Sequence, residues 1–282
     1  MRHRIGIAIV ALALSVWQVA GLHSGEKPVF SVRDHPDFES KHLANKRAIR
    51  VYLPPGYATD KDKRYPVFYL HDGQMRLNAE ATAERLIRAD KIWPVILVFV
   101  ANTKDRFDEY TFHPWPQLKK GGKGTLYGKF LTEELKPYID KEYRTRPDRE
   151  NTAVGGASLG GLVSLDLCRT RGETFSMCAA MSPSLQWGDP AVGPSGIGAG
   201  QDGELFNDLD KDAAWLKKTR IWFDMGGKEF NVARARRLDK FLQKQDREPD
   251  IDYKYFEVKD AGHDVKAWAS RFDQVLLFHF AK

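Results

Sequence analysis

Four glycines surround a single serine in residues 154–162, which read V-G-G-A-S-L-G-G-L. Glycine costs conformational entropy in regular structure, so such a cluster indicates a backbone that bends sharply or packs very closely. A strand-like run at 152–154 precedes the cluster, and a helical run at 159–167 follows it. Strand, G-x-S-x-G turn and helix in this order predict a tight turn that exposes the hydroxyl of Ser158 as a candidate nucleophile. The alternative is a serine that only occupies a glycine-rich turn.

Apolar runs of strand length alternate with segments of helical periodicity along the chain. The run at 94–101 is continuously apolar, as expected for a strand that helices cover on both faces. This alternation predicts an α/β fold with a mainly parallel, doubly wound sheet flanked by helices. We expect strands at 49–53, 65–70, 94–101, 152–155, 175–181, 220–225 and 253–258, and helices at 80–89, 126–143, 159–168, 232–243 and 265–280.

The glycine- and proline-rich stretch 187–204 interrupts this rhythm, but strands and helices continue on both sides of it. We therefore interpret it as one long loop, and we expect residues 25–282 to form a single domain.

Residues 1–24 have the pattern of a secretory signal peptide, with a basic start, M-R-H-R, and an apolar run at 5–20. The apolar run is short for a stable membrane span. We expect cleavage between Ala20 and Ser24 and a periplasmic or secreted protein. An uncleaved N-terminal anchor is the alternative.

The formal net charge is +6, but the basic residues are scattered and often lie beside acids. This distribution differs from the basic stripe of a nucleic-acid-binding protein, so we expect no nucleic-acid partner. No Rossmann, P-loop or zinc motif occurs, and we expect neither a cofactor nor a metal. Cys168 and Cys178 form either a disulfide or a pair of thiols packed in apolar runs.

A nucleophilic serine needs a base, and the histidine comes last in the chain order typical of this turn. Two histidines follow Ser158. His263 comes just after the strand expected at 253–258, where this fold presents its histidine. His279 lies in an apolar helical run and is interpreted as structural. We therefore predict that His263 is the base.

The carboxylate that orients the base should follow the preceding strand. Glu229 lies in the loop just beyond the strand expected at 220–225, whereas its rival Asp224 lies within that strand. We predict Glu229 as the acid and keep Asp224 as the alternative.

The tetrahedral intermediate of acyl transfer needs backbone N–H donors. One should be the N–H of Leu159, directly after the nucleophile. The other should come from the loop after an early strand, where 71–74 reads H-D-G-Q. There Gly73 lets the backbone approach the site, and the N–H of Gln74 is the second predicted donor. His71 has no partner at metal-ligand spacing and is interpreted as structural.

Several stretches together resemble the "putative esterase" family of α/β-hydrolases, the enterochelin-esterase-like and esterase D-like group. The resemblance covers about residues 40–280. The stretches that carry it are R-V-Y-L-P-P-G-Y at 50–57, Y-P-V-F-Y-L-H-D-G-Q at 65–74, N-T-K-D-R-F-D-E-Y at 102–110, P-D-R-E-N-T-A-V-G-G-A-S-L-G-G at 147–161, M-S-P-S-L-Q-W at 181–187 and G-H-D-V-K-A-W at 262–268.

The resemblance implies an α/β-hydrolase fold, and it favours Glu229 because the acid of that group is often glutamate here. It also implies that Arg106 and Trp187 are pocket residues. Arg106 would meet an anionic or phenolic group of the substrate, or else form an ion pair with Glu109. Trp187 would stack on a ring at the mouth of the site, or else pack against the long loop. Where the family often has asparagine after H-D-G-Q, this chain has Met75.

The activity implied by the resemblance is that of a serine carboxylic ester hydrolase, which forms an acyl-enzyme and needs no cofactor. The group includes siderophore-lactone, feruloyl and acetyl-xylan esterases, so we expect a small-molecule or glycan-linked ester as substrate. Two alternatives stay open: an acyltransferase on the same scaffold, and a non-catalytic binding protein. Specificity would depend on the loops at 103–124 and 187–204.

Overall fold

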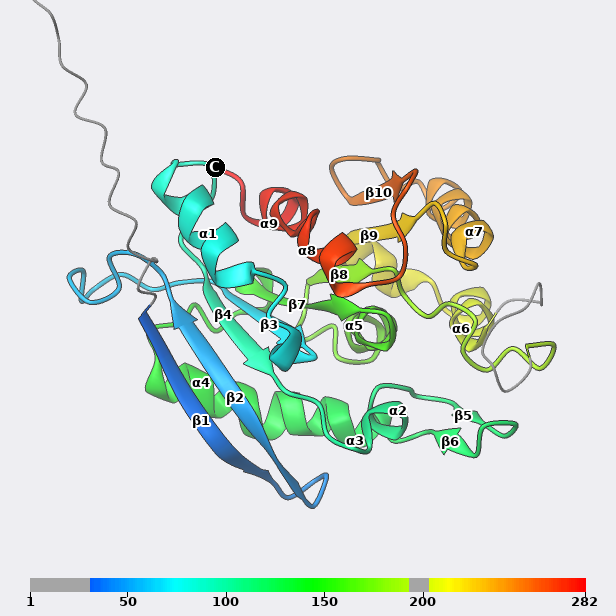
Figure 1. Ribbon diagram of the computed structural model, residues 1–282, viewed down its shortest axis with the longest axis horizontal. Helices are drawn as coiled ribbons and strands as arrows, with labels where there is room; N and C mark the ends of the chain where they lie inside the picture. Colours follow the sequence, from blue (N-terminus) through cyan, green and yellow to red (C-terminus); the bar gives the residue numbers. More distant parts are fainter. Residues whose placement is uncertain (1–30, 193–202) are drawn as a thin grey trace, which may run out of the picture.

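The computed structural model describes residues 31–192 and 203–282. Within them, the main sheet has the strand order β1-β2-β4-β3-β7-β8-β9-β10 (Figure 1). β2 pairs with β1 and β4 in the antiparallel sense, and all other neighbours are parallel. The strands are β1 (Ser31–Ser40), β2 (Asn45–Leu53), β3 (Val67–His71), β4 (Ile96–Val100), β7 (Thr152–Ala157), β8 (Met177–Met181), β9 (Arg220–Gly226) and β10 (Tyr253–Val258).

Helices cover both faces of this sheet, because successive side chains of its central strands alternate between two hydrophobic clusters. In β4, Val98 packs with one cluster and Leu97 with the other. The first cluster includes side chains of α3 (Gly124–Lys129), η2 (Phe130–Leu135), α4 (Lys136–Glu142), α5 (Leu159–Thr170), α6 (Glu204–Lys211), η4 (Ala214–Lys218) and α7 (Val232–Gln243). The second includes side chains of α1 (Ala79–Arg88), α8 (Val265–Ala269) and α9 (Phe272–Phe280).

Short elements complete the described chain: η1 (Gly73–Met75), α2 (Arg106–Glu109), β5 (Pro114–Trp115), β6 (Lys120–Gly121) and η3 (Arg149–Asn151). β5 and β6 form a small antiparallel pair beside α2 and α3 (Figure 1). α2, β5 and β6 lie in the loop region 103–124, for which the sequence predicts no regular structure.

The predicted α/β architecture is confirmed, and each expected strand overlaps an observed one. β1 was not expected, because its charged and mostly exposed side chains and Pro36 hide the alternation of a half-buried strand. The helix expected at 265–280 is two helices, because the backbone breaks between Ala269 and Phe272. The signal peptide expected at 1–24 lies outside the described residues, as do residues 193–202 of the long loop.

The parallel strands end at a common edge of the sheet, which is where ligands bind in folds of this type. Gly73 follows β3, Ser158 follows β7 and Ser182 follows β8. Glu229 lies in the loop after β9, and His263 lies in the loop after β10. The fold therefore gathers the residues singled out by the sequence at one edge.

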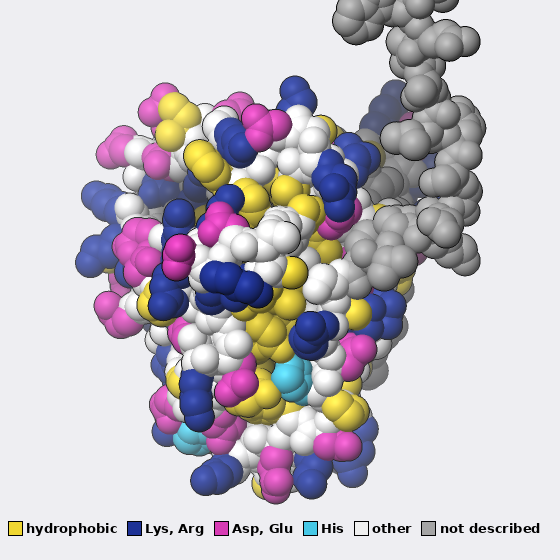
Figure 2. Space-filling view, turned by 90° about the vertical axis from the view of Figure 1, so that its left-hand side faces the viewer, with side chains coloured by type: hydrophobic (Ala, Val, Ile, Leu, Met, Phe, Trp, Pro, Cys, Tyr) yellow, Lys and Arg dark blue, Asp and Glu magenta, His cyan; other side chains and the backbone are white. Residues whose placement is uncertain are grey.

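Charges of both signs are interspersed on the face that Figure 2 shows, around a band of hydrophobic side chains. That face carries no continuous basic patch. None of the helices in the described parts of the chain is both long and apolar enough to cross a membrane. Cys168 and Cys178 are buried free thiols, so the packed-thiol alternative describes this structure.

Candidate active site

Ser158 connects β7 to α5 in a strained turn, with a φ of 60° and a ψ of −121°. A positive φ at a residue other than glycine costs about 1–3 kcal/mol and is often found at functional sites. A Cβ atom at Gly156 would lie 3.0 Å from the Cβ of His71, so the glycine lets β7 approach the end of β3. The Ser158 side chain is partly exposed at the N-terminus of α5. This is the geometry expected of a nucleophile turn.

The hydroxyl of Ser158 has a second serine as its neighbour. Its Oγ lies 3.2 Å from the Oγ of Ser184, and the backbone N–H of Ser184 donates to the Ser158 carbonyl at 3.2 Å. Among the hydrogen bonds of residues 31–192 and 203–282, none joins Ser158 to His263. Such bonds are often long in free enzymes and tighten only when substrate binds. Direct contact between the nucleophile and the base therefore stays a prediction.

His263 and Glu229, which are 34 residues apart, are joined by a hydrogen bond of 2.7 Å between Nδ1 and Oε2. The His263 side chain is about one-third exposed, at 34%, whereas that of Glu229 is 1% exposed. The indole of Trp268 packs edge-on against the imidazole, with 4.9 Å between the ring centroids. The histidine is thus fixed at Nδ1, while its ring remains accessible from solvent.

Glu229 is buried but remains ionised because three donors surround its carboxylate. Its Oε1 accepts from the backbone N–H of Gly226 at 2.7 Å and from Ser182 Oγ at 2.6 Å. Burial raises the pKa of Glu229, but the hydrogen bonds from His263, Ser182 and Gly226 outweigh it and bring the pKa below its ordinary value. An ionised carboxylate here can orient His263 and stabilise an imidazolium.

Asp224, the alternative acid, is engaged elsewhere. Its carboxylate accepts from Trp222 Nε1 at 2.9 Å and from the Ser182 N–H at 3.1 Å, and it pairs with Arg271 at 2.8 Å. Asp224 is fully buried, and burial raises its pKa against the opposing effect of Arg271. The described hydrogen bonds thus join His263 to Glu229 and not to Asp224.

The two predicted backbone donors lie on neighbouring segments, Leu159 at the start of α5 and Gln74 in η1. No hydrogen bond of the described residues uses the N–H of Leu159 or of Gln74, so both remain available. The two segments are close, because a Cβ at Gly160 would lie 3.2 Å from Asp72 Oδ2. A Cβ at Gly73 would lie 2.6 Å from the backbone carbon of Phe99. Gly73 is therefore needed for packing on β4, and an approach of its backbone to substrate stays a prediction.

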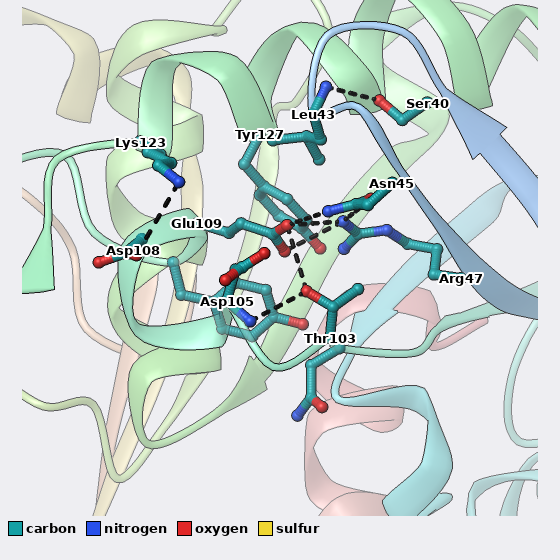
Figure 3. Close-up of polar contacts among 12 residues, drawn as sticks. Ser40, Leu43, Asn45, Arg47, Thr103, Asp105, Asp108, Glu109, Lys123 and Tyr127 are labelled. Atoms are coloured by element: carbon teal, nitrogen blue, oxygen red, sulfur yellow. Dashed lines mark hydrogen bonds and ion pairs between the residues drawn. The ribbon is translucent and has the colours of Figure 1, made fainter.

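Arg106 lies on the side of the site that carries Gly73 and Gln74. Its ion-pair partner is Asp72. Its Nε and Nη2 bind the two carboxylate oxygens of Asp72, each at 2.7 Å. The alternative pairing with Glu109 is wrong, because Glu109 is buried against Arg47 (Figure 3). The Arg106 side chain is 20% exposed, and its contact with a substrate stays a prediction.

Trp187 is 4% exposed, and its indole N–H donates to the carbonyl of His113 at 2.8 Å. Its ring packs edge-on against Trp115, at 5.0 Å between centroids, and near Phe107 at 6.1 Å. The ring is therefore packed, but these contacts come from the loop at 103–124 and not from the long loop at 187–204 that the alternative named. Stacking on a substrate stays a prediction that requires the ring to be uncovered.

The other two histidines weighed from the sequence are buried and neutral. His71 contacts Tyr127 OH at 2.9 Å through Nδ1, and His279 contacts the carbonyl of Cys178 at 3.1 Å. Burial, followed by neighbouring arginines, lowers the pKa of each to about 3. Across the described residues, no group of three or more histidine, cysteine or acidic side chains has the arrangement of a metal site.

Sequence reasoning predicts no role for Ser182, Ser184, Asp72 or Arg271. The motif M-S-P-S at 181–184 was noted only as part of a resemblance. Both serines of that motif contact the site, Ser184 through the nucleophile and Ser182 through Glu229. The sequence feature that could have indicated these contacts is a pair of small hydroxyl residues directly after a buried strand.

Comparisons with known proteins identify the family and the fold of the chain. A family model described as "Putative esterase" matches residues 40–279. Among curated relatives, YbbA of Bacillus subtilis, an uncharacterised protein, is 31% identical over 160 residues, which are 54% of this chain and 62% of YbbA. An endo-1,4-β-xylanase/feruloyl esterase of Xylanibacter ruminicola is 30% identical over 158 residues, which are 51% of this chain and 20% of that protein.

Solved structures share the fold. The enterobactin esterase FES of Shigella flexneri, in the presence of enterobactin, has a TM-score of 0.72 at 21% sequence identity. The match covers 89% of this chain and 59% of that one. Likeness at this identity shows an α/β-hydrolase type of fold. The matches also span less than two thirds of the length of these two curated relatives.

Proposed function

The chain belongs to this esterase family, and on that premise we propose that it is a serine carboxylic ester hydrolase that works through an acyl-enzyme. The observation that carries the proposal is the 2.7 Å bond between His263 and Glu229, in loops at the same sheet edge as Ser158. A buried, ionised carboxylate bound to an accessible histidine beside a strained serine turn has a ready chemical use in acyl transfer.

In the first half-reaction, Ser158 Oγ attacks the ester carbonyl carbon while its proton passes to His263 Nε2. The resulting oxyanion is stabilised by the N–H groups of Leu159 and Gln74. The bond to the leaving alcohol then breaks, and His263 returns the proton to that alcohol. The products of this step are the free alcohol and an acyl group esterified to Ser158.

In the second half-reaction, water attacks the acyl-enzyme with His263 as base. The carboxylic acid leaves, and Ser158 recovers its proton. Glu229 keeps Nδ1 of His263 protonated, so that Nε2 can accept in each half-reaction. The ester and one water molecule complete this balance of atoms and electrons.

The substrate proposed is a small aryl or acyl ester of the siderophore-lactone, feruloyl or acetyl class. Names of relatives, feruloyl esterase and enterobactin esterase, support the first two classes. Three large apolar side chains that are close in sequence to site residues are exposed, namely Phe107 at 46%, Phe230 at 41% and Val265 at 41%. They would offer apolar surface to an acyl group. Export by a signal peptide in residues 1–24 is part of the proposal and is tested by N-terminal sequencing of the exported protein.

The test is hydrolysis of p-nitrophenyl acetate, methyl ferulate and a catecholate lactone by the protein and by its Ser158→Ala variant. We expect turnover of at least one ester and a loss of about 10⁴-fold or more in kcat in the variant. Thermal unfolding of both proteins should coincide within a few degrees. Undiminished turnover in the folded Ser158→Ala variant would overturn the proposal.

A further inference from the structure

We infer that Ser182 is a positioning residue whose hydroxyl holds the Glu229 carboxylate in place to orient His263, an inference that rests on the function proposed above. Ser182 Oγ donates to Glu229 Oε1 at 2.6 Å, and the opposite oxygen, Oε2, accepts from His263 at 2.7 Å. Ser182 touches neither Ser158 nor His263 through any described hydrogen bond, so it would act on His263 through Glu229, which is hydrogen-bonded to both residues.

The backbone at Ser182 is held in an unfavourable conformation. Ser182 follows the last residue of β8, is fully buried and has a φ of 42°. Its N–H donates to the Asp224 carbonyl at 3.0 Å and to Asp224 Oδ1 at 3.1 Å. A left-handed serine that neighbouring groups fix in this way is often found at functional sites. Here the turn directs the hydroxyl toward Glu229.

The direction of the Ser182 hydroxyl proton follows from its neighbours. Ser182 Oγ accepts from Arg271 Nη2 at 2.7 Å and from Trp268 Nε1 at 3.0 Å. Guanidinium and indole nitrogens can only donate, and a hydroxyl has one proton and two lone pairs. Both lone pairs are therefore occupied, and the proton is left for Glu229. A hydroxyl with a single available orientation is a better anchor than one that can rotate.

This donor also completes the coordination of Glu229. Oε1 receives the N–H of Gly226 at 2.7 Å together with Ser182 Oγ, and Oε2 receives Nδ1 of His263. Each oxygen thus has a partner on a different segment of the chain. Rotation of the carboxylate would break at least two charge-assisted hydrogen bonds, which are among the stronger ones in proteins.

Ser182 is also hydrogen-bonded to a buried ion pair. Arg271 pairs with Asp224 at 2.8 Å, and its Nη2 lies 4.0 Å from Glu229 Oε1. The Arg271 side chain is 3% exposed, at the break between α8 and α9. The arginine orients Ser182 and brings positive charge near Glu229, while Asp224 balances that charge. This arrangement accounts for a buried ion pair that takes no part in the chemistry itself.

The variants that test the inference are Ser182→Ala and Ser182→Gly. Glycine adopts a φ of 42° without strain, so Ser182→Gly removes the hydroxyl and relieves the backbone at once. The matched control is Ser176→Ala at the opposite end of β8. Ser176 is also buried, and its hydroxyl donates to the carbonyl of Arg149 at 2.6 Å, away from the site.

We expect kcat to fall about 10- to 100-fold in both Ser182 variants, as for loss of a hydrogen bond to a charged group, with KM within about twofold. The acid limb of the kcat/KM profile, which reports protonation of the base, should move to higher pH, because a carboxylate with one donor fewer attracts an imidazolium more strongly. Ser176→Ala should leave kcat and the profile unchanged. A Ser182→Gly variant that is folded and has the wild-type kcat and profile would overturn the inference.

A double-variant cycle separates this inference from the proposed function. In a Glu229→Gln background, Ser182→Ala should change kcat less than about twofold, because its effect requires the carboxylate. A full additional loss would show that Ser182 acts by another route and would overturn the inference. If Glu229→Gln itself leaves kcat intact, the proposed triad fails, whatever the result at Ser182.

Discussion

Two buried arginine–carboxylate clusters lie near the site, and they differ in what their hydrogen bonds reach. We call Glu229, Ser182, Arg271 and Asp224 the acid cluster. Its hydrogen bonds lead from Arg271 through Ser182 and Glu229 to His263, which is partly exposed. The ion pair of Arg271 and Asp224 is thus connected to the accessible imidazole of His263.

The second cluster, which we call the loop cluster, consists of Glu109, Arg47, Asn45 and Thr103 (Figure 3). Arg47 Nη2 binds both oxygens of Glu109, at 2.9 and 3.0 Å, and both side chains are at most 1% exposed. Asn45 and Thr103 donate to Glu109 at 2.7 and 3.3 Å. These contacts join β2 to the loop that carries Arg106, and none of them involves Ser158, Glu229 or His263.

The remaining nitrogens of Arg47 connect the loop cluster to no further polar group of the described residues. Nε and Nη1 have no hydrogen-bond partner among the described residues, and the guanidinium instead lies 4.6 Å from the ring centroid of Phe130. Removing one member of a buried pair usually costs more stability than the pair supplies. We conclude that the loop cluster serves the fold, whereas the acid cluster serves both the fold and His263.

Replacing the carboxylate of each cluster should give the largest difference between the clusters, both in kcat and in the free energy of unfolding. Glu229→Gln should lower kcat about 10³- to 10⁴-fold while the protein stays folded, because an amide cannot stabilise the imidazolium in the same way. Glu109→Gln should leave kcat within about tenfold but destabilise the fold by about 3–5 kcal/mol, since Arg47 keeps its buried charge. Ester turnover and urea unfolding of both variants measure this. Equal losses of kcat would abolish the distinction between the clusters.

The loop cluster should also tolerate an apolar replacement of both partners. Arg47→Met alone leaves Glu109 buried and unpaired, with an expected cost of about 3–5 kcal/mol. The double variant Arg47→Met, Glu109→Leu should recover at least about half of that loss, because no charge is then left unpaired. Urea unfolding of the single and double variants gives the comparison. A double variant less stable than Arg47→Met would assign the pair a stabilising role of its own.

The pH dependence of the free energy of unfolding should show the lowered pKa of Glu229. Because its folded pKa lies below its ordinary value of 4.5, its contribution to stability is fully present above that pH and is lost as pH falls through the folded pKa. The free energy of unfolding of the wild type should thus decline more steeply than that of Glu229→Gln between about pH 4.5 and 3. Urea unfolding across this range measures both slopes. Parallel slopes would mean that Glu229 is not held as an anion.

The smallest effect is expected at the exposed ion pair of the same loop region. Lys123 Nζ lies 3.9 Å from Asp108, and the lysine side chain is 51% exposed (Figure 3). Lys123→Ala should change the free energy of unfolding by about 0–1 kcal/mol, because solvent screens such pairs. Urea unfolding beside Arg47→Met provides the contrast. A loss as large as that of Arg47→Met would show that burial is not what separates these pairs.

The sequence predicted the parts of the site that depend on local order along the chain. Glycine spacing located the turn at Ser158, and the positions after two strands located Glu229 and His263. Glu229 and His263 lie side by side in the structure because the carboxyl ends of parallel strands meet at one edge. The prediction of Glu229 as the histidine's partner agrees with the bond at 2.7 Å.

What the sequence did not predict depends on pairs of residues that are far apart along the chain. Asp72 and Arg106 are 34 residues apart, and Ser182 and Arg271 are 89 apart. Composition does not reveal which arginine reaches which acid, so the ion pair considered as the alternative for Arg106 was with Glu109, three residues along the chain. Likewise, the break between α8 and α9 is hidden by apolar periodicity that continues across it.

The central claim, that Ser158 is an activated nucleophile, is tested most directly by covalent labelling. The protein and its Ser158→Ala variant are incubated with a fluorophosphonate probe, and the modified residue is located by mass spectrometry. We predict one adduct on Ser158 and none in the variant. A folded protein that gives no adduct, or one labelled at another serine, would contradict the claim.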